Sequence, residues 1–384
     1  MMAEVQGHCD AKFQRVREII NEFLASGEEV GLSLAVNVDG RDVVDLWGGH
    51  ADVEKARPWK RDTIVNVWST TKILSSLAVL KLADEGRLSL DDKVAKHWPE
   101  FAANGKQDIE VRHILAHSAG LAGWAEPLTL ERMCADLPGS TAMLAAQAPM
   151  WPPGTASGYH ALTMGHLLGE IVRRVSGLSL TEFVSKKLAA PVDADLQIGC
   201  READWPRVAD VIPPPAVELF HAPPDSIAMK MLNPLPDPAY ANTPTWRRAE
   251  VGAANGHSNA QGLVRVLKAV TLAGQQNSPG LLSKETVDSI FREQTNGADL
   301  GMGLMFRYGM GMALRLDGGS CLDDFLPEGR VCAWGGWGGS MGVMDLERKV
   351  TITYAMNKMS NDRPAPKMLR AYMKEIYSSL GVQT

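Results

Sequence analysis

The sequence has no apolar run long enough to cross a bilayer and no cluster of basic residues. A transmembrane helix needs about 20 consecutive apolar residues, and nucleic-acid-binding domains are usually basic. This chain instead carries 39 basic and 45 acidic side chains, with a formal net charge of −6. We therefore expect no nucleic-acid partner and no membrane partner. The first ten residues lack the charged-then-apolar pattern of a signal peptide, so a cytoplasmic protein is expected.

Cysteines are few and isolated. Their odd number, five, and their scattered positions favour buried reduced thiols over a disulfide framework. No two of them have the Cys-x-x-Cys spacing of a zinc site. The glycines in residues 301–311 lack the lysine and the strand–helix setting of a phosphate-binding loop. We therefore expect neither a metal ion nor another cofactor.

Both ends of the chain have hydrophobic patterns typical of an antiparallel sheet covered by helices. Runs that alternate apolar and polar residues predict strands, and stripes with helical spacing predict helices. Asp39-Gly40 lies between two alternating runs, which predicts a β-hairpin with a two-residue turn. The predicted elements are a helix at residues 13–24, the hairpin at 31–48, two strands at 330–357 around a turn at 346–349, and a last helix at 365–380.

The middle of the chain is mainly helical and is followed by a proline-rich segment. Residues 206–244 contain ten of the 22 prolines. Proline is excluded from the interior of a regular helix and from a central strand, so we expect an extended segment that lines or covers a site. The other predicted helices lie at residues 161–177, 180–188, 262–270 and 283–291.

With 384 residues, the chain is long enough for one large domain or two ordinary ones. We interpret it as an α+β protein in which residues 1–90 and 246–384 form a discontinuous α/β sheet domain. Residues 91–245 then form an inserted helical, proline-rich domain. A ligand site is expected in the cleft between the two.

The main chemical hypothesis comes from a polar turn, residues 66–72, that precedes an apolar helix ending near Glu85-Gly86. If the helix begins near Ser69, then Ser69 and Lys72 share one face of its first turn. An amine, the helix dipole and unpaired N–H groups would then all act on the Ser69 hydroxyl. Free serine is a poor nucleophile without such help. By itself, the pattern also fits an N-capping serine followed by a surface lysine.

Three further stretches are candidates for the same site. Residues 151–161 form a Pro/Gly turn that places Tyr159 just before a helix, although a tyrosine there is also typical of ordinary packing. The glycines of residues 335–340 would let the backbone approach a ligand closely. Residues 255–258 predict a polar turn that caps a helix starting near Ala260.

Together these stretches resemble the family VIII carboxylesterases, serine esterases with the fold of class C β-lactamases and penicillin-binding proteins. The resemblance covers about residues 31–359 and includes the Ser-x-x-Lys spacing of penicillin-recognising enzymes. It implies a β-lactamase/transpeptidase-like fold, with an antiparallel sheet, flanking helices and an inserted helical domain. The matching motifs are residues 66–72, His117-Ser118-Ala119-Gly120-Leu121, Tyr159-His160-Ala161-Leu162, Ala254-Asn255-Gly256-His257 and Trp334-Gly335-Gly336-Trp337-Gly338-Gly339-Ser340.

The resemblance assigns a role to each matching residue. It implies that Ser69 is the nucleophile and that Lys72 and Tyr159 activate it. Trp334-Gly335-Gly336 corresponds to the third motif, where β-lactamases have Lys-Thr-Gly, and is expected to bind substrate. The oxyanion hole would use the backbone N–H groups of Ser69 and Trp337.

Some residues depart from the β-lactamase pattern or allow two interpretations. Ala161 stands where those enzymes usually have Asn, and Trp334 replaces a lysine, which weakens recognition of an anionic β-lactam and suits an ester. The third motif could also be shifted by three positions, to start at Trp337. Trp124 and His257 are further candidates for substrate contact, with core packing and loop hydrogen bonds as the alternatives.

The general base is the open chemical question. Lys72 starts from a pKa of ~10.4, so being half neutral near pH 7.4 requires a shift of about three units, or roughly 4 kcal/mol. Tyr159 starts near ~10 and faces a similar deficit. A Lys–Tyr pair can share one proton, either as phenolate beside ammonium or as phenol beside amine. The sequence favours neither form.

We expect a serine esterase that cleaves short or medium acyl esters through an acyl-enzyme. The alternatives are an acyltransferase that uses an alcohol or amine, a weak β-lactamase or D-amino-acid peptidase, and a non-catalytic binding or assembly protein of the same fold. The expected partner is a small-molecule ester, and an oligomer is compatible with the sequence.

Overall fold

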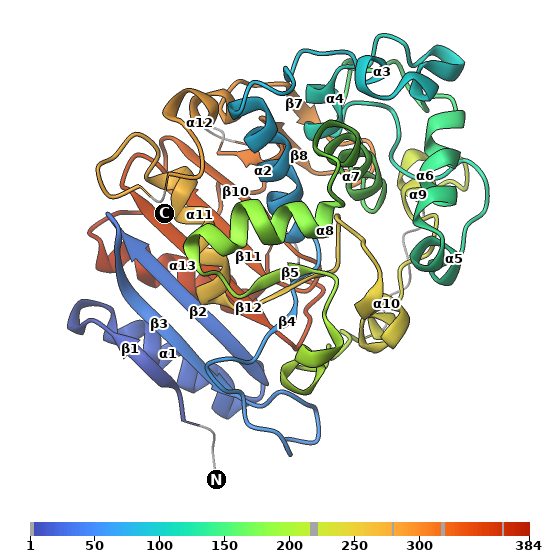
Figure 1. Ribbon diagram of the computed structural model, residues 1–384. Coiled ribbons are helices and arrows are strands. Elements are labelled where there is room, and N and C mark those ends of the chain that lie inside the picture. Colours follow the sequence, from blue (N-terminus) through green and yellow to red (C-terminus); the bar gives the residue numbers. More distant parts are fainter. Residues whose placement is uncertain (1–3, 216–221, 279, 316–318, 363–364) are drawn as a thin grey trace.

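The computed structural model describes residues 4–215, 222–278, 280–315, 319–362 and 365–384. Its centre is a nine-stranded antiparallel sheet with the strand order β1-β3-β2-β12-β11-β10-β9-β8-β7 (Figure 1). Strands from both ends of the chain therefore meet in one sheet. They are β1 (Gln6–Cys9), β2 (Gly31–Val38), β3 (Arg41–Gly49), β7 (Thr295–Ala298), β8 (Met305–Tyr308), β9 (Ala313–Leu314), β10 (Val331–Gly335), β11 (Met341–Asp345) and β12 (Val350–Met356).

The predicted hairpin is confirmed. β2 pairs with β3 around the turn Asp39-Gly40, and both turn residues have positive φ, 48° and 88°. This is the backbone that a two-residue hairpin turn requires, and Asn, Asp and Gly adopt it at the lowest cost. β2 also pairs with β12, which joins the N-terminal hairpin to the C-terminal strands.

Helices cover both faces of this sheet (Figure 1). Successive residues of β12 show the alternation: Thr353 Oγ1 donates to Ala260 O of α11, whereas the Tyr354 ring lies 5.5 Å from that of Tyr372 in α13. The predicted α+β class, an antiparallel sheet flanked by helices, is confirmed. The flanking helices are α1 (Gln14–Ser26), α2 (Thr71–Asp84), α11 (Ala260–Thr271), α12 (Lys284–Ile290) and α13 (Lys367–Ser379).

The middle of the chain supplies the other α-helices. They are α3 (Val94–His97), α4 (Val111–Leu115), α5 (Leu130–Ala135), α6 (Leu137–Ala146), α7 (Thr163–Ser176), α8 (Leu180–Phe183), α9 (Ile227–Met231) and α10 (Pro244–Arg248). α9 lies inside the proline-rich segment, where its five residues fit between prolines. Residues 216–221 of that segment lie outside the described residues. The domain boundaries at residues 90 and 245 stay a prediction. No helix in the described ranges is long and apolar enough to span a membrane.

Two segments of the sequence-based description are corrected. Residues 330–357 hold three strands instead of two, because the glycine-rich residues 336–340 form a turn between β10 and β11. Residues 256–258 are strand β6 instead of a turn, and Asn259 caps α11. β6 lies between β4 (Val65–Asn66) and β5 (Leu196–Ile198) in a small second sheet.

Candidate active site

Ser69 lies in the turn between β4 and α2. The helix α2 begins at Thr71, two residues later than the sequence predicted. The turn keeps the predicted geometry, because the Lys72 N–H donates to Ser69 O at 2.9 Å. Trp68, just before the serine, has φ +47°. A bulky residue in the left-handed region stores backbone strain, which is common where a functional side chain must be presented.

The structure brings the three predicted side chains together. Lys72 Nζ lies 3.1 Å from Ser69 Oγ, and the Tyr159 hydroxyl lies 2.7 Å from the same oxygen. Lys72 comes from the first turn of α2, whereas Tyr159 comes from the loop before α7. Ser69 Oγ is therefore contacted by an amine and by a phenol, and an adjacent basic group of this kind can activate a serine hydroxyl.

Lys72 is buried and has polar neighbours but no acid. Besides Ser69 Oγ, its Nζ donates to Ala161 O at 2.7 Å and to Ala253 O at 2.9 Å. No carboxylate of a described residue lies within ion-pair distance of it. Burial lowers the pKa of Lys72 well below its usual value, because an apolar interior disfavours the ammonium form.

Burial acts in the opposite direction on Tyr159 and raises the pKa of its phenol. The side chains of Ser69 and Trp334 lower that pKa, and the Asp299 charge raises it further. The two shifts together favour phenol beside amine, one of the two forms that the sequence left open. In this form, Lys72 can accept the Ser69 proton and Tyr159 can donate one.

The backbone N–H groups of Ser69 and Trp337 are the predicted donors of the oxyanion hole. Neither the Ser69 N–H nor the Trp337 N–H donates a hydrogen bond to another described residue. The segments that carry them are held together by Ser340, whose Oγ donates to Val67 O at 2.7 Å and lies 3.0 Å from Thr70 Oγ1. Unpaired N–H groups in this position are suited to bind a developing oxyanion.

Trp334 lies at the end of β10 beside Tyr159, with ring centroids 5.4 Å apart. Its indole also lies near Phe306, Tyr308 and His117, with centroid distances of 5.6–5.7 Å. The register that aligns Trp334-Gly335-Gly336 with the third motif therefore places its first residue against Tyr159. An aromatic wall at this point is apolar where a lysine would be cationic.

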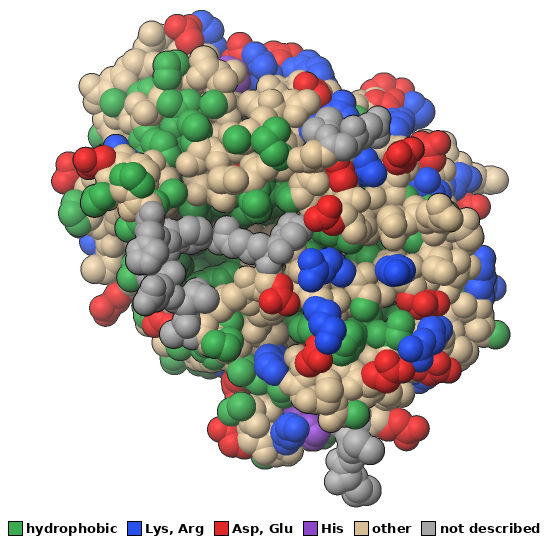
Figure 2. Space-filling view, turned by 180° about the vertical axis from the view of Figure 1, so that it is seen from behind, with side chains coloured by type: hydrophobic (Ala, Val, Ile, Leu, Met, Phe, Trp, Pro, Cys, Tyr) green, Lys and Arg blue, Asp and Glu red, His purple; other side chains and the backbone are tan. Residues whose placement is uncertain are grey.

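A cleft of about 510 Å³ contains Ser69 and Tyr159 together with Trp334, Gly335 and Gly336. On the face shown in Figure 2, hydrophobic side chains gather around a hollow. The described charged residues lining the cleft are the acids Asp237 and Asp362, and no described lysine or arginine lines it. The apolar lining residues include Leu130, Met231, Leu232, Pro234, Pro236, Met302, Leu304, Phe306, Leu322, Phe325 and Leu369.

Trp124 and His257 do not line this cleft, which corrects their assignment to substrate binding. The Trp124 indole is buried and donates to Ser140 O at 2.8 Å. His257 is buried, and its Nδ1 lies 3.0 Å from Gly199 O and 2.9 Å from Asn255 O. Both residues have the structural roles that were their alternatives.

The histidines of the motifs also have structural partners. His117 and His113 have the spacing of a helical zinc pair, but His117 Nδ1 accepts from the His160 N–H and His113 Nδ1 accepts from the Glu110 N–H. No group of three or more metal-ligating side chains occurs in the part of the chain that the structure describes. His160 is buried behind Tyr159, and its Nδ1 lies 2.7 Å from Gly158 O.

Two residues of the site were not anticipated from the sequence. Ala253 contributes only a carbonyl, which no side-chain pattern reveals. Asp299 is buried and accepts from the Tyr159 N–H at 2.9 Å. Its only sequence signal is that it precedes the Gly301-Met302-Gly303 turn.

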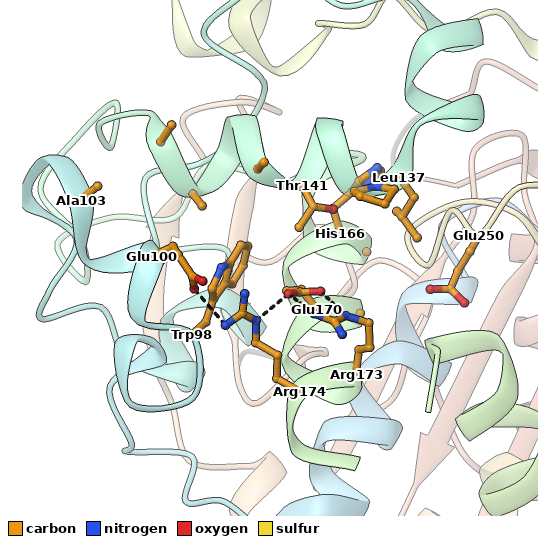
Figure 3. A pocket seen from close by; sticks show the side chains of 16 residues that line it. Trp98, Glu100, Ala103, Leu137, Thr141, His166, Glu170, Arg173, Arg174 and Glu250 are labelled. Atoms are coloured by element: carbon orange, nitrogen blue, oxygen red, sulfur yellow. Dashed lines mark hydrogen bonds and ion pairs between the residues drawn. The ribbon is translucent and has the colours of Figure 1, made fainter. Parts of the chain in front are cut away.

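A second pocket, of about 610 Å³, shares no lining residue with the cleft. It lies between α6 and α7 (Figure 3). Glu170 there binds both Arg173 and Arg174, and Arg174 also pairs with Glu100. These charged groups satisfy one another, and small side chains such as Ala142 and Gly169 form much of the remaining lining.

Comparison with known proteins places the chain in a family. Residues 16–375 match the family model described as Beta-lactamase, and the chain therefore belongs to the β-lactamase family. It is 32% identical to the Esterase/beta-lactamase LipL of Mycobacterium tuberculosis over 92% of this chain and 83% of that protein.

Solved structures show the same similarity. A crystal structure of a family VIII carboxylesterase has a TM-score of 0.90 and 35% identity, covering 98% of this chain and all of that one. A penicillin-binding protein homologue from Caulobacter crescentus has a TM-score of 0.88 and 33% identity, covering 98% of this chain and 99% of that one. The predicted resemblance is thereby confirmed.

Proposed function

We propose that this protein is a serine carboxylesterase that cleaves esters of short or medium apolar acids through an acyl-enzyme on Ser69. The observation that carries the proposal is the pair of contacts on Ser69 Oγ, 3.1 Å to Lys72 Nζ and 2.7 Å to the Tyr159 hydroxyl. The similarity to a family VIII carboxylesterase and to an esterase/β-lactamase supports the reaction class.

Acylation begins when the neutral amine of Lys72 accepts the Ser69 proton. Ser69 Oγ then bonds to the ester carbonyl carbon, and the carbonyl electron pair moves onto oxygen. The N–H groups of Ser69 and Trp337 bind this oxyanion, each donor lowering the barrier by roughly 3 kcal/mol. When the carbon–oxygen bond to the alcohol breaks, the Tyr159 phenol protonates the departing alkoxide, and the Lys72 ammonium returns a proton to the phenolate.

Deacylation repeats these steps with water in place of the alcohol. Lys72 takes a proton from water while the water oxygen attacks the acyl carbon. Ser69 Oγ then leaves and receives a proton from Tyr159. The acid product then departs. A second alcohol in place of water would give acyl transfer by the same route.

The cleft favours an uncharged acyl group. Its described lining is mostly apolar, and its charged members Asp237 and Asp362 are acids. A β-lactam carboxylate would gain nothing from Trp334, which occupies the position of the lysine in the β-lactamase motif. We therefore expect an ester to be a better substrate than a β-lactam. The name of the relative LipL includes both esterase and β-lactamase.

The test is a panel of 4-nitrophenyl esters of rising acyl length, compared with the chromogenic β-lactam nitrocefin. We expect turnover of the esters, with an optimum at short or medium length, and much slower turnover of nitrocefin. Adding a competing alcohol separates hydrolysis from acyl transfer. Nitrocefin turnover as fast as that of the best ester would contradict the proposal, as would failure of a fluorophosphonate probe to label Ser69 in the folded protein.

A further inference from the structure

We propose that Asp299 is a positioning residue for Tyr159: its buried carboxylate fixes the backbone that presents the phenol to Ser69. The proposal rests on the proposed function, because it concerns the residue that acts there as proton donor. Asp299 directly follows β7 and does not line the cleft. Asp299 can therefore affect catalysis only through the residues that it holds, which are Tyr159, Gly301 and Met302 by their N–H groups and Tyr308 by its hydroxyl.

The contacts of Asp299 concentrate on one oxygen. Its Oδ1 accepts three backbone N–H groups, from Tyr159, Gly301 and Met302, each at 2.9 Å. The side chain is buried, and no described lysine or arginine lies within ion-pair distance. A buried carboxylate is stable only when hydrogen bonds satisfy it, so its geometry and the position of the Tyr159 backbone depend on each other.

A second contact joins the same two loops. The Leu300 N–H donates to Ser157 O at 2.8 Å, two residues before the tyrosine. A Cβ added at Gly301 would lie only 3.3 Å from the Tyr159 nitrogen, so the two backbones approach closely. Two hydrogen bonds and this close backbone packing therefore hold the loop of residues 299–304 against the loop that carries the phenol.

The negative charge of Asp299 also affects the protonation of Tyr159. It raises the pKa of Tyr159, because a negative charge nearby disfavours phenolate. The carboxylate thus holds the tyrosine in place and also helps to keep it as phenol, the form that can protonate a leaving alkoxide.

The test uses two esters of the same acid. An alkyl alkoxide must be protonated as it leaves, whereas 4-nitrophenolate leaves without a proton. The ratio of kcat/KM for the alkyl ester to that for the 4-nitrophenyl ester therefore reports how well Tyr159 acts as an acid. Rates are normalised to the fraction of protein labelled by a fluorophosphonate, so that unfolded protein does not contribute.

Four variants give the comparison. Tyr159→Phe should lower the ratio by about 100-fold or more, the usual contribution of general acid catalysis. Asp299→Ala should lower it about 10- to 100-fold, as a misplaced catalytic group does, and Asp299→Glu should also lower it because the carboxylate is displaced. Asp299→Asn keeps the acceptor oxygen and should restore the ratio to within about threefold of the wild type.

Asp52 provides the matched control. It is also buried and accepts two backbone N–H groups, from Ala56 and Arg57, but it does not line the cleft. Asp52→Ala should lower stability without changing the ester ratio. Should Asp299→Ala fail to fold, Asp299→Glu carries the same comparison.

The ester ratios of these variants separate the role of Asp299 from the role of Tyr159. A ratio that falls in Asp299→Ala or Asp299→Glu, recovers in Asp299→Asn and stays constant in Asp52→Ala supports the proposal. A constant ratio in the Ala and Glu variants, with a reduced ratio in Tyr159→Phe, overturns the role of Asp299 alone. A constant ratio in Tyr159→Phe overturns the acid role of the tyrosine in the proposed function, and the role of Asp299 with it.

Discussion

The hydroxyl of Tyr159 lies 2.7 Å from Ser69 Oγ, although 90 positions separate the two residues in the sequence. On the other side of the same oxygen, Lys72 Nζ lies 3.1 Å away. Burial shifts the pKa of the lysine down and that of the tyrosine up. One serine therefore has an amine and a phenol beside it, and the two pKa shifts both favour the neutral forms that the proposed mechanism uses.

Replacing Lys72, the proposed general base, should lower the activity and raise the stability of the protein. We expect Lys72→Met to lose at least about 100-fold in kcat/KM, because general base catalysis contributes that much. The same variant should be more stable than the wild type at neutral pH, because it removes the cost of burying an ammonium or of deprotonating it. Ester kinetics and thermal unfolding of both proteins check this. Retained activity, or a lower melting temperature, would contradict it.

The pH dependence of the wild type follows from the same shift. The amine is the active form, so kcat/KM should rise with pH as Lys72 loses its proton. Because the folded pKa lies below the unfolded value, the unfolded chain binds more protons between the two values, and the contribution of Lys72 to stability rises with pH in that window. A pH profile of ester hydrolysis tests the first statement. Urea unfolding of wild type and Lys72→Met at several pH values tests the second.

A buried acid that does not line the cleft, Glu29, gives a pH effect of opposite sign. Glu29 accepts hydrogen bonds from Tyr354 and Tyr372, and burial raises its pKa to about 7. The folded protein then binds more protons than the unfolded chain between about pH 4.5 and 7, so its free energy of unfolding should fall as pH rises through this range, by up to about 3 kcal/mol.

Urea unfolding at pH 5 and pH 8 measures this effect. Glu29→Gln should flatten the dependence, because an amide does not titrate. Glu28→Gln is the control, since that neighbour is partly exposed and pairs with Lys367 at the surface. Equal pH dependence in wild type and Glu29→Gln would exclude Glu29 as its source.

The turn that carries Trp337, the second oxyanion donor of the proposed mechanism, has no room for a side chain at Gly336. A Cβ there would lie 2.2 Å from Ser340 Oγ and 2.3 Å from Val67 O. Gly336→Ala should therefore push this turn away from the nucleophile and lower kcat about 10-fold or more, with a smaller effect on KM.

Gly169 is the matched control for that variant. It lies in α7, where an added Cβ has its nearest contact at 3.6 Å from the Leu180 side chain. Gly169→Ala should leave kcat unchanged and raise stability by about 0.5–1 kcal/mol, because alanine favours a helix. Equal kinetics in Gly336→Ala and wild type would show that the turn is not part of the oxyanion site.

The elements with strong local signals were predictable from the sequence. The hairpin at Asp39-Gly40 and α1 up to Gly27 depend on turn residues and spacing, which act over a few positions. The nine-stranded order did not follow from these signals, since pairing of β2 with β12 joins segments that are far apart in the chain. The strand β6 was missed because three buried residues carry no alternation.

The site shows the same division. Ser69 and Lys72 could be paired from their spacing, whereas Tyr159 needed the resemblance to a family before it could be assigned to them. Trp124 was misassigned because a tryptophan in the core and one in a pocket wall look alike in the sequence. Asp299 was missed because its partner is a backbone N–H 140 positions away.

Mass spectrometry of the intact protein tests the central claim most directly. After mixing with a slowly turned-over ester and rapid acid quenching, the wild type should gain the mass of one acyl group, located by peptide mapping on the peptide that contains Ser69. Ser69→Ala should gain none and should lose ester hydrolysis. A wild type that turns over ester without an adduct at Ser69, or a Ser69→Ala variant that hydrolyses the ester at the wild-type rate, would contradict the account.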